Sequence, residues 1–342
     1  MRPSSKGPRD LNDSMPPKTD VIWMDGRFVP WDEAKVHVLA HGLHYGTGLF
    51  EGLRCYRTAD GPAIFRLEDH LRRFYRSAAH LYMDLPVRLE DLTDICREVV
   101  VRNGLEDGYL RPVAFYGLGG MNFSFRDNAV HVAVAVWPWG AYLGEEGMRR
   151  GIRVKTVSWI KTPANSVPSA AKLAGNYVNA CLAFQEAMRA GFDEAILLNE
   201  AGRVAEGTGE NVFLVADGSI VTPPGSEDLL PGITRDSVLR IASDLGYDVR
   251  EAPVSRSDLY SADELFLTGT AAEVTPVREV DWHAIGAGQA GPVTLEVQKA
   301  FFAAVHGENP RYRMWLTPVE AAVSAGVGNV RQMTESVSAN VK

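Results

Sequence analysis

A single lysine stands among small residues in the segment PSAAKLAGNY, residues 168–177. A lysine on a solvated surface normally has charged neighbours, whereas Lys172 has only small side chains, a hydroxyl, an amide and a phenol near it in the sequence. An amine that is hard to hydrate becomes a nucleophile, as Schiff-base chemistry requires. The alternative is a lysine at the start of a helix whose ammonium group reaches the solvent. The rest of the chain decides between these interpretations.

Length, charge and cysteine content exclude several classes of protein. The chain has 342 residues and a net charge of −8, without a basic run of the kind that binds nucleic acid. The cysteines Cys55, Cys96 and Cys181 form no CxxC pair, which argues against a disulfide framework or a zinc site and fits a reducing compartment. No apolar stretch approaches the length of a membrane span. We therefore expect a soluble cytoplasmic protein without a metal and without a nucleic-acid or membrane partner.

The hydrophobic pattern predicts two domains that both mix helices and strands. Helices are predicted at 67–81, 89–103, 176–190 and 234–245, and strands at 50–56, 109–116, 130–137, 152–157, 194–198, 203–206, 211–215 and 264–267. The predicted order along the chain is a disordered extension at 1–19, a small α/β domain at 20–138, a connector at 139–147, a larger domain at 148–319 and a tail at 320–342.

Two loops have the composition of an anion site. The segment LPGITRD, residues 230–236, leads into a helix, and the free N–H groups of a helix N-terminus attract phosphate. The segment TGTAAEVTP, residues 268–276, follows a strand, and its small side chains allow an anion to approach the backbone. Taken alone, the first loop is better explained by ordinary capping of a surface helix, and the second is a weak signal.

The segment EGTGEN, residues 206–211, places two carboxylates between glycines directly after a strand. One interpretation is an acidic turn. The other is that Glu206 pairs with the nitrogen of a pyridine ring, with Glu210 in a supporting role. A reactive lysine, a phosphate seat and a carboxylate for the ring nitrogen are what a pyridoxal phosphate enzyme requires.

These motifs occur together in an order that resembles one family. From about residue 21 to 316 the chain is similar to the branched-chain aminotransferases, which are class IV (fold-type IV) pyridoxal phosphate enzymes. The resemblance is carried by HGLHYGT (41–47), FEG (50–52), YLRP (109–112), WGAY (139–142), AAK (170–172) with NY (176–177), EGTGEN (206–211), LPGITRD (230–236) and GTAAE (269–273).

The resemblance implies a two-domain α/β fold of the D-amino acid aminotransferase type, with a smaller N-terminal α/β domain and a larger C-terminal α/β pseudo-barrel domain. It implies transfer of the amino group between L-leucine, L-isoleucine or L-valine and 2-oxoglutarate. The cofactor would be pyridoxal 5′-phosphate, used in a ping-pong mechanism. The assembly would be a homodimer or a higher homo-oligomer such as a hexamer.

The resemblance also implies roles for cofactor-binding residues. Lys172 would bind the cofactor covalently and then carry the proton between the substrate Cα and the cofactor. Glu206 would hold the pyridine nitrogen and Tyr177 the ring oxygen. The phosphate contacts would come from Arg73, Ile233, Thr234 and Thr270. Without the resemblance, Arg73 is an ordinary arginine on a surface helix beside Arg72 and Arg76.

The substrate pocket must accept both an apolar branched side chain and the carboxylate of glutamate. Arg111 would bind that carboxylate, and Tyr109 with the backbone of Ala271 and Ala272 would bind the α-carboxylate. An apolar wall would be formed by Tyr45, Phe50, Trp139 and Tyr142. The alternative for these aromatic residues is core packing, their commoner fate.

The loop at 120–128 departs from the family pattern, and Phe123, Phe125 and Arg126 in it are candidates for altering specificity. Two other functions remain open at this point. One is another class IV enzyme, such as a D-amino acid or (R)-amine transaminase or an aminodeoxychorismate lyase. The other is a non-catalytic protein that binds the cofactor.

Overall fold

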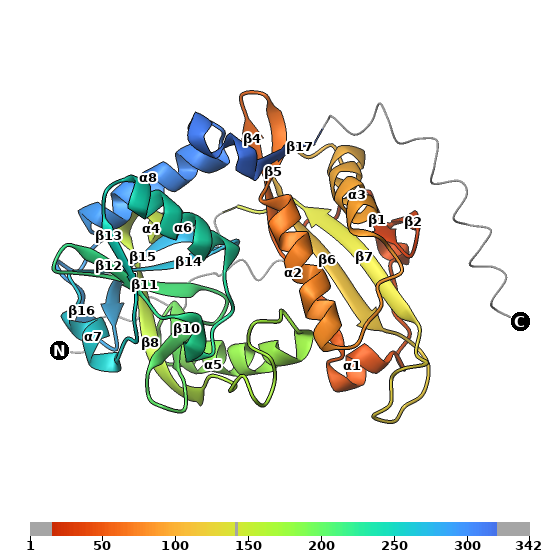
Figure 1. Ribbon diagram of the computed structural model, residues 1–342, viewed down its shortest axis with the longest axis horizontal. Coiled ribbons are helices and arrows are strands. Elements are labelled where there is room, and N and C mark those ends of the chain that lie inside the picture. The colour runs from red at the N-terminus through yellow and green to blue at the C-terminus, as the bar shows by residue number, and fades with distance from the viewer. Residues whose placement is uncertain (1–15, 141–142, 320–342) are drawn as a thin grey trace, which may run out of the picture. The chain divides into compact units, whose positions relative to one another are not determined.

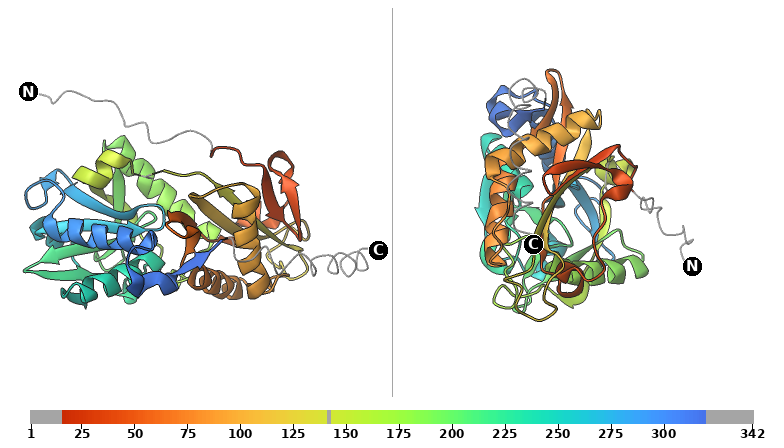
Figure 2. Two further views of the ribbon diagram at one scale, coloured as in Figure 1. Left: turned by 90° about the horizontal axis from the view of Figure 1, so that it is seen from above. Right: turned by 90° about the vertical axis from the view of Figure 1, so that its right-hand side faces the viewer.

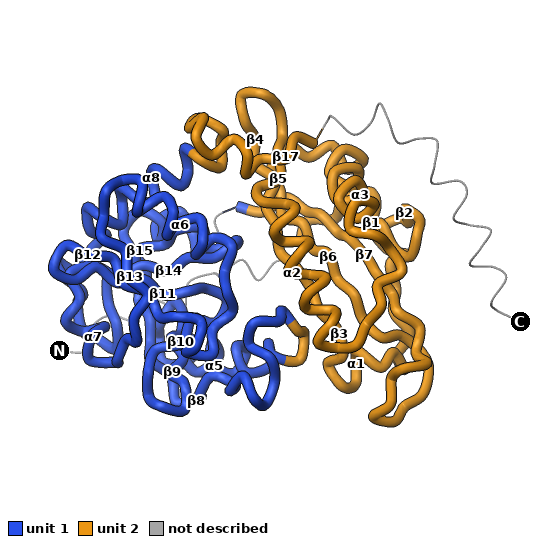
Figure 3. The backbone as a smooth tube through the Cα atoms, in the orientation of Figure 1, with its two compact units in different colours: residues 1–15, 140–172, 176–303 blue, residues 16–139, 173–175, 304–342 orange. Residues whose placement is uncertain are grey.

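The computed structural model describes residues 16–140 and 143–319, which divide into two compact units (Figures 1 and 3). The N-terminal unit comprises 16–139, 173–175 and 304–319, and the C-terminal unit comprises 140, 143–172 and 176–303. Residues 1–15 of the predicted extension and the whole predicted tail at 320–342 lie outside the described residues.

The N-terminal unit is built on an eight-stranded sheet with the order β17-β5-β4-β6-β7-β1-β2, and β3 pairs with β6. α3 packs on β7 and β1, and α2 packs on β3 and α3, so both helices cover the sheet (Figure 2). The elements are β1 (Val21–Met24), β2 (Arg27–Pro30), α1 (His41–Tyr45), β3 (Gly48–Phe50), β4 (Leu53–Thr58), β5 (Gly61–Phe65), α2 (Leu67–His80), α3 (Leu89–Arg102), β6 (Gly108–Tyr116), β7 (Val130–Trp137) and β17 (Leu316–Pro318).

Helix α2 shows how the spacing of apolar residues determines which face of a helix is buried in this unit. Leu67, Leu71, Phe74 and Ala78 recur at the spacing of one helical face and are all buried. Glu68 and Asp69 lie in the first turn and His80 in the last, where their charges complement the helix dipole. Burial of each large side chain contributes about 1.5–3 kcal/mol.

The strand predicted at 50–56 is interrupted. β3 ends at Phe50 and β4 begins at Leu53, which leaves Glu51 and Gly52 between them. The Glu51 side chain turns into the interior, where it is fully buried. A Cβ atom at residue 52 would lie 1.8 Å from the Tyr109 hydroxyl, so this close approach requires glycine.

The C-terminal unit is built on a nine-stranded sheet with the order β10-β9-β8-β15-β14-β11-β12-β13, and β16 pairs with β15. Its helix α5 packs on β8 and β9, α6 on β13 and β14, and α4 on β15. The elements are α4 (Glu145–Arg150), β8 (Ile152–Ile160), α5 (Tyr177–Arg189), β9 (Glu194–Leu198), β10 (Val204–Gly207), β11 (Asn211–Ala216), β12 (Ser219–Thr222), α6 (Ile233–Asp244), β13 (Asp248–Glu251), α7 (Arg256–Ser261), β14 (Glu264–Gly269), β15 (Glu273–Val280), β16 (His283–Ala284) and α8 (Pro292–Val305).

The four predicted helices are all found within one or two residues of their expected ends. The helices α7 and α8 and the strands β13 and β15 were not predicted from the sequence. Residues 304–319 pack with the N-terminal unit because β17 pairs antiparallel with β5, although the sequence placed them in the second domain. Within the described ranges, no helix combines the length and apolar character needed to cross a membrane.

Leu71→Ala is expected to lower the free energy of unfolding by about 2–5 kcal/mol, because it leaves a cavity beneath α2 where Leu71 is fully buried. Urea unfolding of the variant measures this. The matched control is Arg72→Ala, whose side chain is 55% exposed and whose effect should stay within about 0.5 kcal/mol. Equal losses in the two variants would contradict the assignment of this face to the core.

Candidate active site

Lys172 lies shortly before Tyr177, the first residue of α5. Its Nζ donates a hydrogen bond to the Tyr177 hydroxyl at 2.7 Å, and it lies 5.3 Å from the centroid of that ring. Lys172 is half-buried rather than exposed. The turn before it is closed by the Asn176 side chain, which donates to the Pro168 carbonyl at 3.1 Å. The local sequence therefore brings the amine and the phenol together.

Glu206 is buried at the end of β10 and has partners on both carboxylate oxygens. Oε1 lies 2.5 Å from the Lys161 ammonium group. Oε2 accepts hydrogen bonds from the Leu230 N–H at 2.9 Å and from the Asn211 side chain at 3.4 Å. The same Asn211 amide donates to the Leu230 carbonyl at 3.0 Å. These contacts join β10, β11 and the segment that leads into α6.

The N-terminus of α6 is the first predicted phosphate seat. Ile233 and Thr234 are its first two residues, both are buried, and among the described residues no side chain caps the helix. The first N–H groups of an α-helix have no partner within the helix. A Cβ atom at residue 232 would lie 2.0 Å from Asn211 Oδ1, so Gly232 is needed for this turn to approach the Glu206 network. The result is a helix end suited to an anion.

The turn between β14 and β15 contains Thr270, Ala271 and Ala272. It packs closely on the 206–210 loop, because a Cβ atom at Gly269 would lie 3.0 Å from the Gly209 carbonyl. Thr275 Oγ1 donates to the Ala272 carbonyl at 2.6 Å and closes the turn from behind. The loop predicted at 268–276 is thus only the turn 270–272 between two strands, and the end of β14 beside it lies against the segment that follows Glu206.

Two further carboxyl groups, Glu194 and Glu210, are buried near Glu206. Glu194 Oε1 accepts from the Thr208 hydroxyl at 2.8 Å, and Glu210 Oε2 accepts from the Gly209 N–H at 3.0 Å. Burial raises the pKa of Glu210 to about 7, and the charge of Glu206 adds to this. Burial and the charge of Glu210 raise the pKa of Glu194 well above its usual value. Both carboxyl groups therefore hold their protons to a higher pH than an ordinary glutamate does.

In the N-terminal unit, Arg73 is held by a buried carboxylate. Arg73 Nε and Nη2 donate to the two oxygens of Glu51 at 2.7 and 2.9 Å, and His70 Nδ1 lies 2.8 Å from Glu51 Oε2. Burial opposes ionisation of Glu51, but the charges of Arg73 and His70 hold its pKa well below the usual range. Arg73 is buried, which rules out the surface-helix interpretation.

The predicted substrate residues Phe50, Tyr109, Arg111 and Trp139 lie together in this unit. The Arg111 guanidinium stands 4.6 Å from the Phe50 ring centroid and 5.3 Å from that of Tyr109. Tyr109 contacts Trp139 edge-to-face at 4.4 Å. Within the described part of the chain, the buried Arg111 Nε has no hydrogen-bond partner. An unsatisfied buried donor beside aromatic walls suits a carboxylate.

Tyr45 makes contacts with other residues of the N-terminal unit. It packs on His41 and Phe123, and its hydroxyl donates to the Met121 carbonyl at 3.1 Å. In the unusual loop, Phe125 packs against His41 and Tyr116, whereas Phe123 is 88% exposed. Phe125 therefore anchors the loop, and Phe123 is the residue it presents outward. The predicted residue Tyr142 lies outside the described residues.

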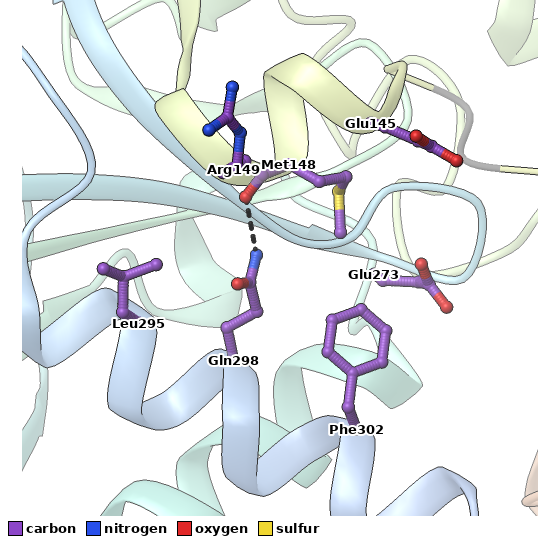
Figure 4. A pocket seen from close by; sticks show the side chains of 7 residues that line it. All are labelled: Glu145, Met148, Arg149, Glu273, Leu295, Gln298 and Phe302. Atoms are coloured by element: carbon purple, nitrogen blue, oxygen red, sulfur yellow. Dashed lines mark hydrogen bonds between the residues drawn. The ribbon is translucent and has the colours of Figure 1, made fainter.

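A surface cavity of about 360 Å³ lies elsewhere in the C-terminal unit (Figure 4). It is formed by α4, β15 and α8, and the Gln298 side chain at its centre donates to the Met148 carbonyl at 3.0 Å. Its lining includes none of the predicted site residues. The chemistry of Lys172 and Glu206, rather than this hollow, locates the candidate site.

Sequence reasoning missed the residues that support the site, namely Lys161, Glu194, Glu51 and His70. Glu51 stood inside the FEG motif, and a carboxylate between apolar residues and glycine was an available signal. The other three carry no local signal, because their partners lie far along the chain. Glu194 is 14 residues from Thr208, His70 is 19 residues from Glu51, and Lys161 reaches Glu206 in another strand.

Comparison with known proteins identifies the family of this chain. The model of the family described as amino-transferase class IV matches residues 48–280. A branched-chain-amino-acid aminotransferase of Pseudomonas aeruginosa is 46% identical over 307 residues, which cover 90% of this chain and 100% of that protein.

Two solved structures are also similar. The crystal structure of the Escherichia coli branched-chain amino acid aminotransferase has a TM-score of 0.87 at 44% identity and covers 88% of this chain and 100% of that one. The branched-chain amino acid aminotransferase of Thermoproteus uzoniensis, solved with norvaline, has a TM-score of 0.84 at 42% identity, over 88% and 99% of the two chains. The predicted fold is thereby confirmed.

Glu210→Gln is expected to stabilise the protein more at pH 8 than at pH 5. The pKa of Glu210 is about 7 in the folded protein against 4.5 for an ordinary glutamate, so the folded state binds an extra proton between these pH values. Stability from this group is complete below pH 4.5 and is lost as pH rises through 7.

Glutamine does not ionise. From pH 5 to pH 8 the free energy of unfolding of the variant should therefore rise by up to about 3 kcal/mol relative to that of the wild type. Urea unfolding at pH 5 and pH 8 measures it. Glu200→Gln, at an exposed position, is the matched control and should show no such change. A pH-independent difference for Glu210→Gln would refute the assignment.

Proposed function

Because the chain belongs to the class IV aminotransferases, we propose that the Lys172 site transfers the amino group between L-leucine, L-isoleucine or L-valine and 2-oxoglutarate. The observation that carries this proposal is the pairing of Lys172 Nζ with the Tyr177 hydroxyl at 2.7 Å, in the same unit as the network around Glu206. Branched-chain aminotransferases are the relatives at 45–46% identity over about nine tenths of the chain. The product of the reaction is the branched-chain 2-oxo acid together with L-glutamate.

The residues present fit pyridoxal 5′-phosphate. The uncapped, buried N-terminus of α6 offers N–H groups for a phosphate, and the buried Glu206 carboxylate offers an acceptor for a protonated ring nitrogen. Bound at Lys172, this cofactor supplies an aldehyde for the amine and a ring that accepts electrons from the substrate Cα. Arg73, fixed by Glu51, would hold the phosphate, with Ile233, Thr234 and Thr270.

The chain's own residues would then perform three tasks. Lys172 would move a proton between the substrate Cα and the cofactor carbon, as a general base and then a general acid. Tyr177, which accepts a hydrogen bond from Lys172 Nζ, would hold the ring oxygen and orient the amine. Glu206, fixed through Leu230 and Asn211, would keep the ring nitrogen protonated.

Substrate recognition would come from the cluster around Arg111. Its rings would enclose a branched apolar side chain, and the Arg111 guanidinium would bind the second carboxylate of glutamate. Tyr109 with the backbone of Ala271 and Ala272 would bind the α-carboxylate. Tyr45 and Tyr142 are proposed to complete the apolar wall.

We also propose that the chain acts as a homodimer or a higher homo-oligomer. Both units expose large apolar side chains: Trp159, Ile160, Val178 and Leu182 in the C-terminal unit, and Val36, Val38, Leu39 and Leu43 in the N-terminal unit. Exposed apolar patches of this kind mark interaction surfaces. Sedimentation equilibrium should give a multiple of 37.4 kDa, and a monomer at micromolar concentration would contradict the proposal.

We propose a cytoplasmic location because the cysteines form no disulfide. Cys55, Cys96 and Cys181 are all free thiols, which persist in a reducing compartment. Cell fractionation tests this, and recovery in an extracytoplasmic fraction would overturn it.

The decisive measurement is the absorption spectrum of the protein loaded with pyridoxal phosphate, before and after L-leucine is added. The Schiff-base band should disappear as the cofactor takes up the amino group, and 2-oxoglutarate should restore it. Lys172→Ala should lack the band, and its turnover rate should fall by at least about a thousandfold. Its unfolding should match that of the wild type.

Competing functions give different spectra. A band that ignores L-leucine but responds to D-alanine or an (R)-amine would assign the site to another class IV activity. A band that responds to no amine would favour a binding protein without catalysis. Full turnover in Lys172→Ala would end the proposal.

A further inference from the structure

Lys161 follows the last residue of β8 and points its ammonium group at Glu206. The distance from Lys161 Nζ to Glu206 Oε1 is 2.5 Å, and the side chains are only 14% and 9% exposed. A buried charge is tolerated when it is paired. This ion pair is therefore a fixed part of the C-terminal unit rather than a surface contact.

The two residues reach each other across an intervening strand. In the sheet, β9 lies between β8 and β10 (Figure 3). Strands two places apart are separated by about 9–10 Å, which a lysine and a glutamate side chain span together. A shorter side chain such as Asn or Asp at either position would fall short, so the pairing depends on these two side-chain lengths.

The register of β9 with both neighbours shifts where these side chains are presented. On one side the pairing of β8 shifts between Thr156 and Ile160, and on the other that of β10 shifts between Val204 and Glu206. Irregularities of this kind re-aim side chains and are common beside active sites. Both shifts occur opposite the same end of β9, where the Lys161 N–H donates to the Leu198 carbonyl at 2.8 Å.

The backbone around Lys161 is also tied to the helix that carries Tyr177. Asn179 of α5 donates to the Ile160 carbonyl at 2.9 Å and accepts from the Thr162 N–H at 3.4 Å. Residues on both sides of Lys161 are thus clamped, and the lysine is held in register with the start of α5.

The Lys161–Glu206 ion pair lies among other ionisable groups whose pKa values depend on one another. Burial raises the pKa of Glu210, the charge of Glu206 adds to this, and the charge of Lys172 acts in the opposite direction. Burial and then the charge of Glu210 raise the pKa of Glu194. The region thus contains three carboxyl groups and the two amines Lys161 and Lys172. Lys161 is in direct contact with Glu206.

We propose that Lys161 is a positioning residue for the cofactor: it fixes Glu206 Oε1, neutralises the Glu206 carboxylate, and so sets how strongly that carboxylate stabilises positive charge on the pyridine ring. This inference rests on the proposed function. Glu206 Oε2 is held independently by Leu230 and Asn211, so removal of the Lys161 charge changes the field at the ring more than the position of the carboxylate.

The test is a pH titration of the Schiff-base absorption band in the cofactor-loaded protein. In Lys161→Met the uncompensated Glu206 charge should stabilise the protonated Schiff base, and the midpoint should move to higher pH by about half a unit or more. Lys161→Gln should show the same shift, because it removes the charge while it keeps a polar side chain. Lys161→Arg should titrate like the wild type. If Lys161→Met does not fold, Lys161→Gln carries the test.

Two controls separate this effect from a merely structural one. Lys155 lies in β8, and its ammonium group is 3.6 Å from Glu186 Oε1. Lys155→Met removes this nearby lysine and should not move the midpoint. In a Glu206→Gln background, Lys161→Met should give a smaller shift than in the wild-type background, since the part of its effect that is transmitted through the Glu206 carboxylate is gone.

The inference would be overturned by an unshifted midpoint in both Lys161→Met and Lys161→Gln, or by an equal shift in Lys155→Met. The proposed function would still stand in that case if the wild-type band responds to L-leucine. Absence of the band in the wild type would remove the proposed function itself.

Discussion

The buried Glu206 carboxylate is the group around which the polar residues of the C-terminal unit are arranged. Its two oxygens bind the Lys161 ammonium group, the Leu230 N–H and the Asn211 amide. Removing a carboxylate from water costs several kcal/mol, and these partners together offset that cost. One side chain thereby fixes β8, β10, β11 and the approach to α6 relative to one another.

Glycines make this arrangement possible by allowing close approach. Added Cβ atoms would lie 2.0 Å from Asn211 Oδ1 at residue 232, 2.9 Å from Glu210 Oε2 at residue 207, and 3.0 Å from the Gly209 carbonyl at residue 269. Because no side chain separates these segments, the 206–211 segment packs directly against the end of β14 and against the turn before α6.

The N-terminal unit contains a second buried ion pair, in which the carboxylate supports the cation. There the fully buried Glu51 holds Arg73 through two hydrogen bonds and is itself supported by His70. A bidentate pair restrains the guanidinium plane as well as its position. In both units a carboxylate and a cation are paired in the interior, and in each the residue predicted to bind the cofactor, Glu206 or Arg73, is one member of the pair.

The sequence by itself determined what depends on neighbours along the chain. It predicted the proximity of Lys172 and Tyr177, the amphipathic helices, the turn before α6 and the two glycine-containing loops, because helical spacing and turn chemistry are local. Only the tertiary structure decided that Lys161 meets Glu206 across β9, that Glu194 and Glu210 share a buried region, and that Glu51 and His70 hold Arg73. These contacts depend on strand order and on register shifts, and neither can be read from residues that are far apart in the chain.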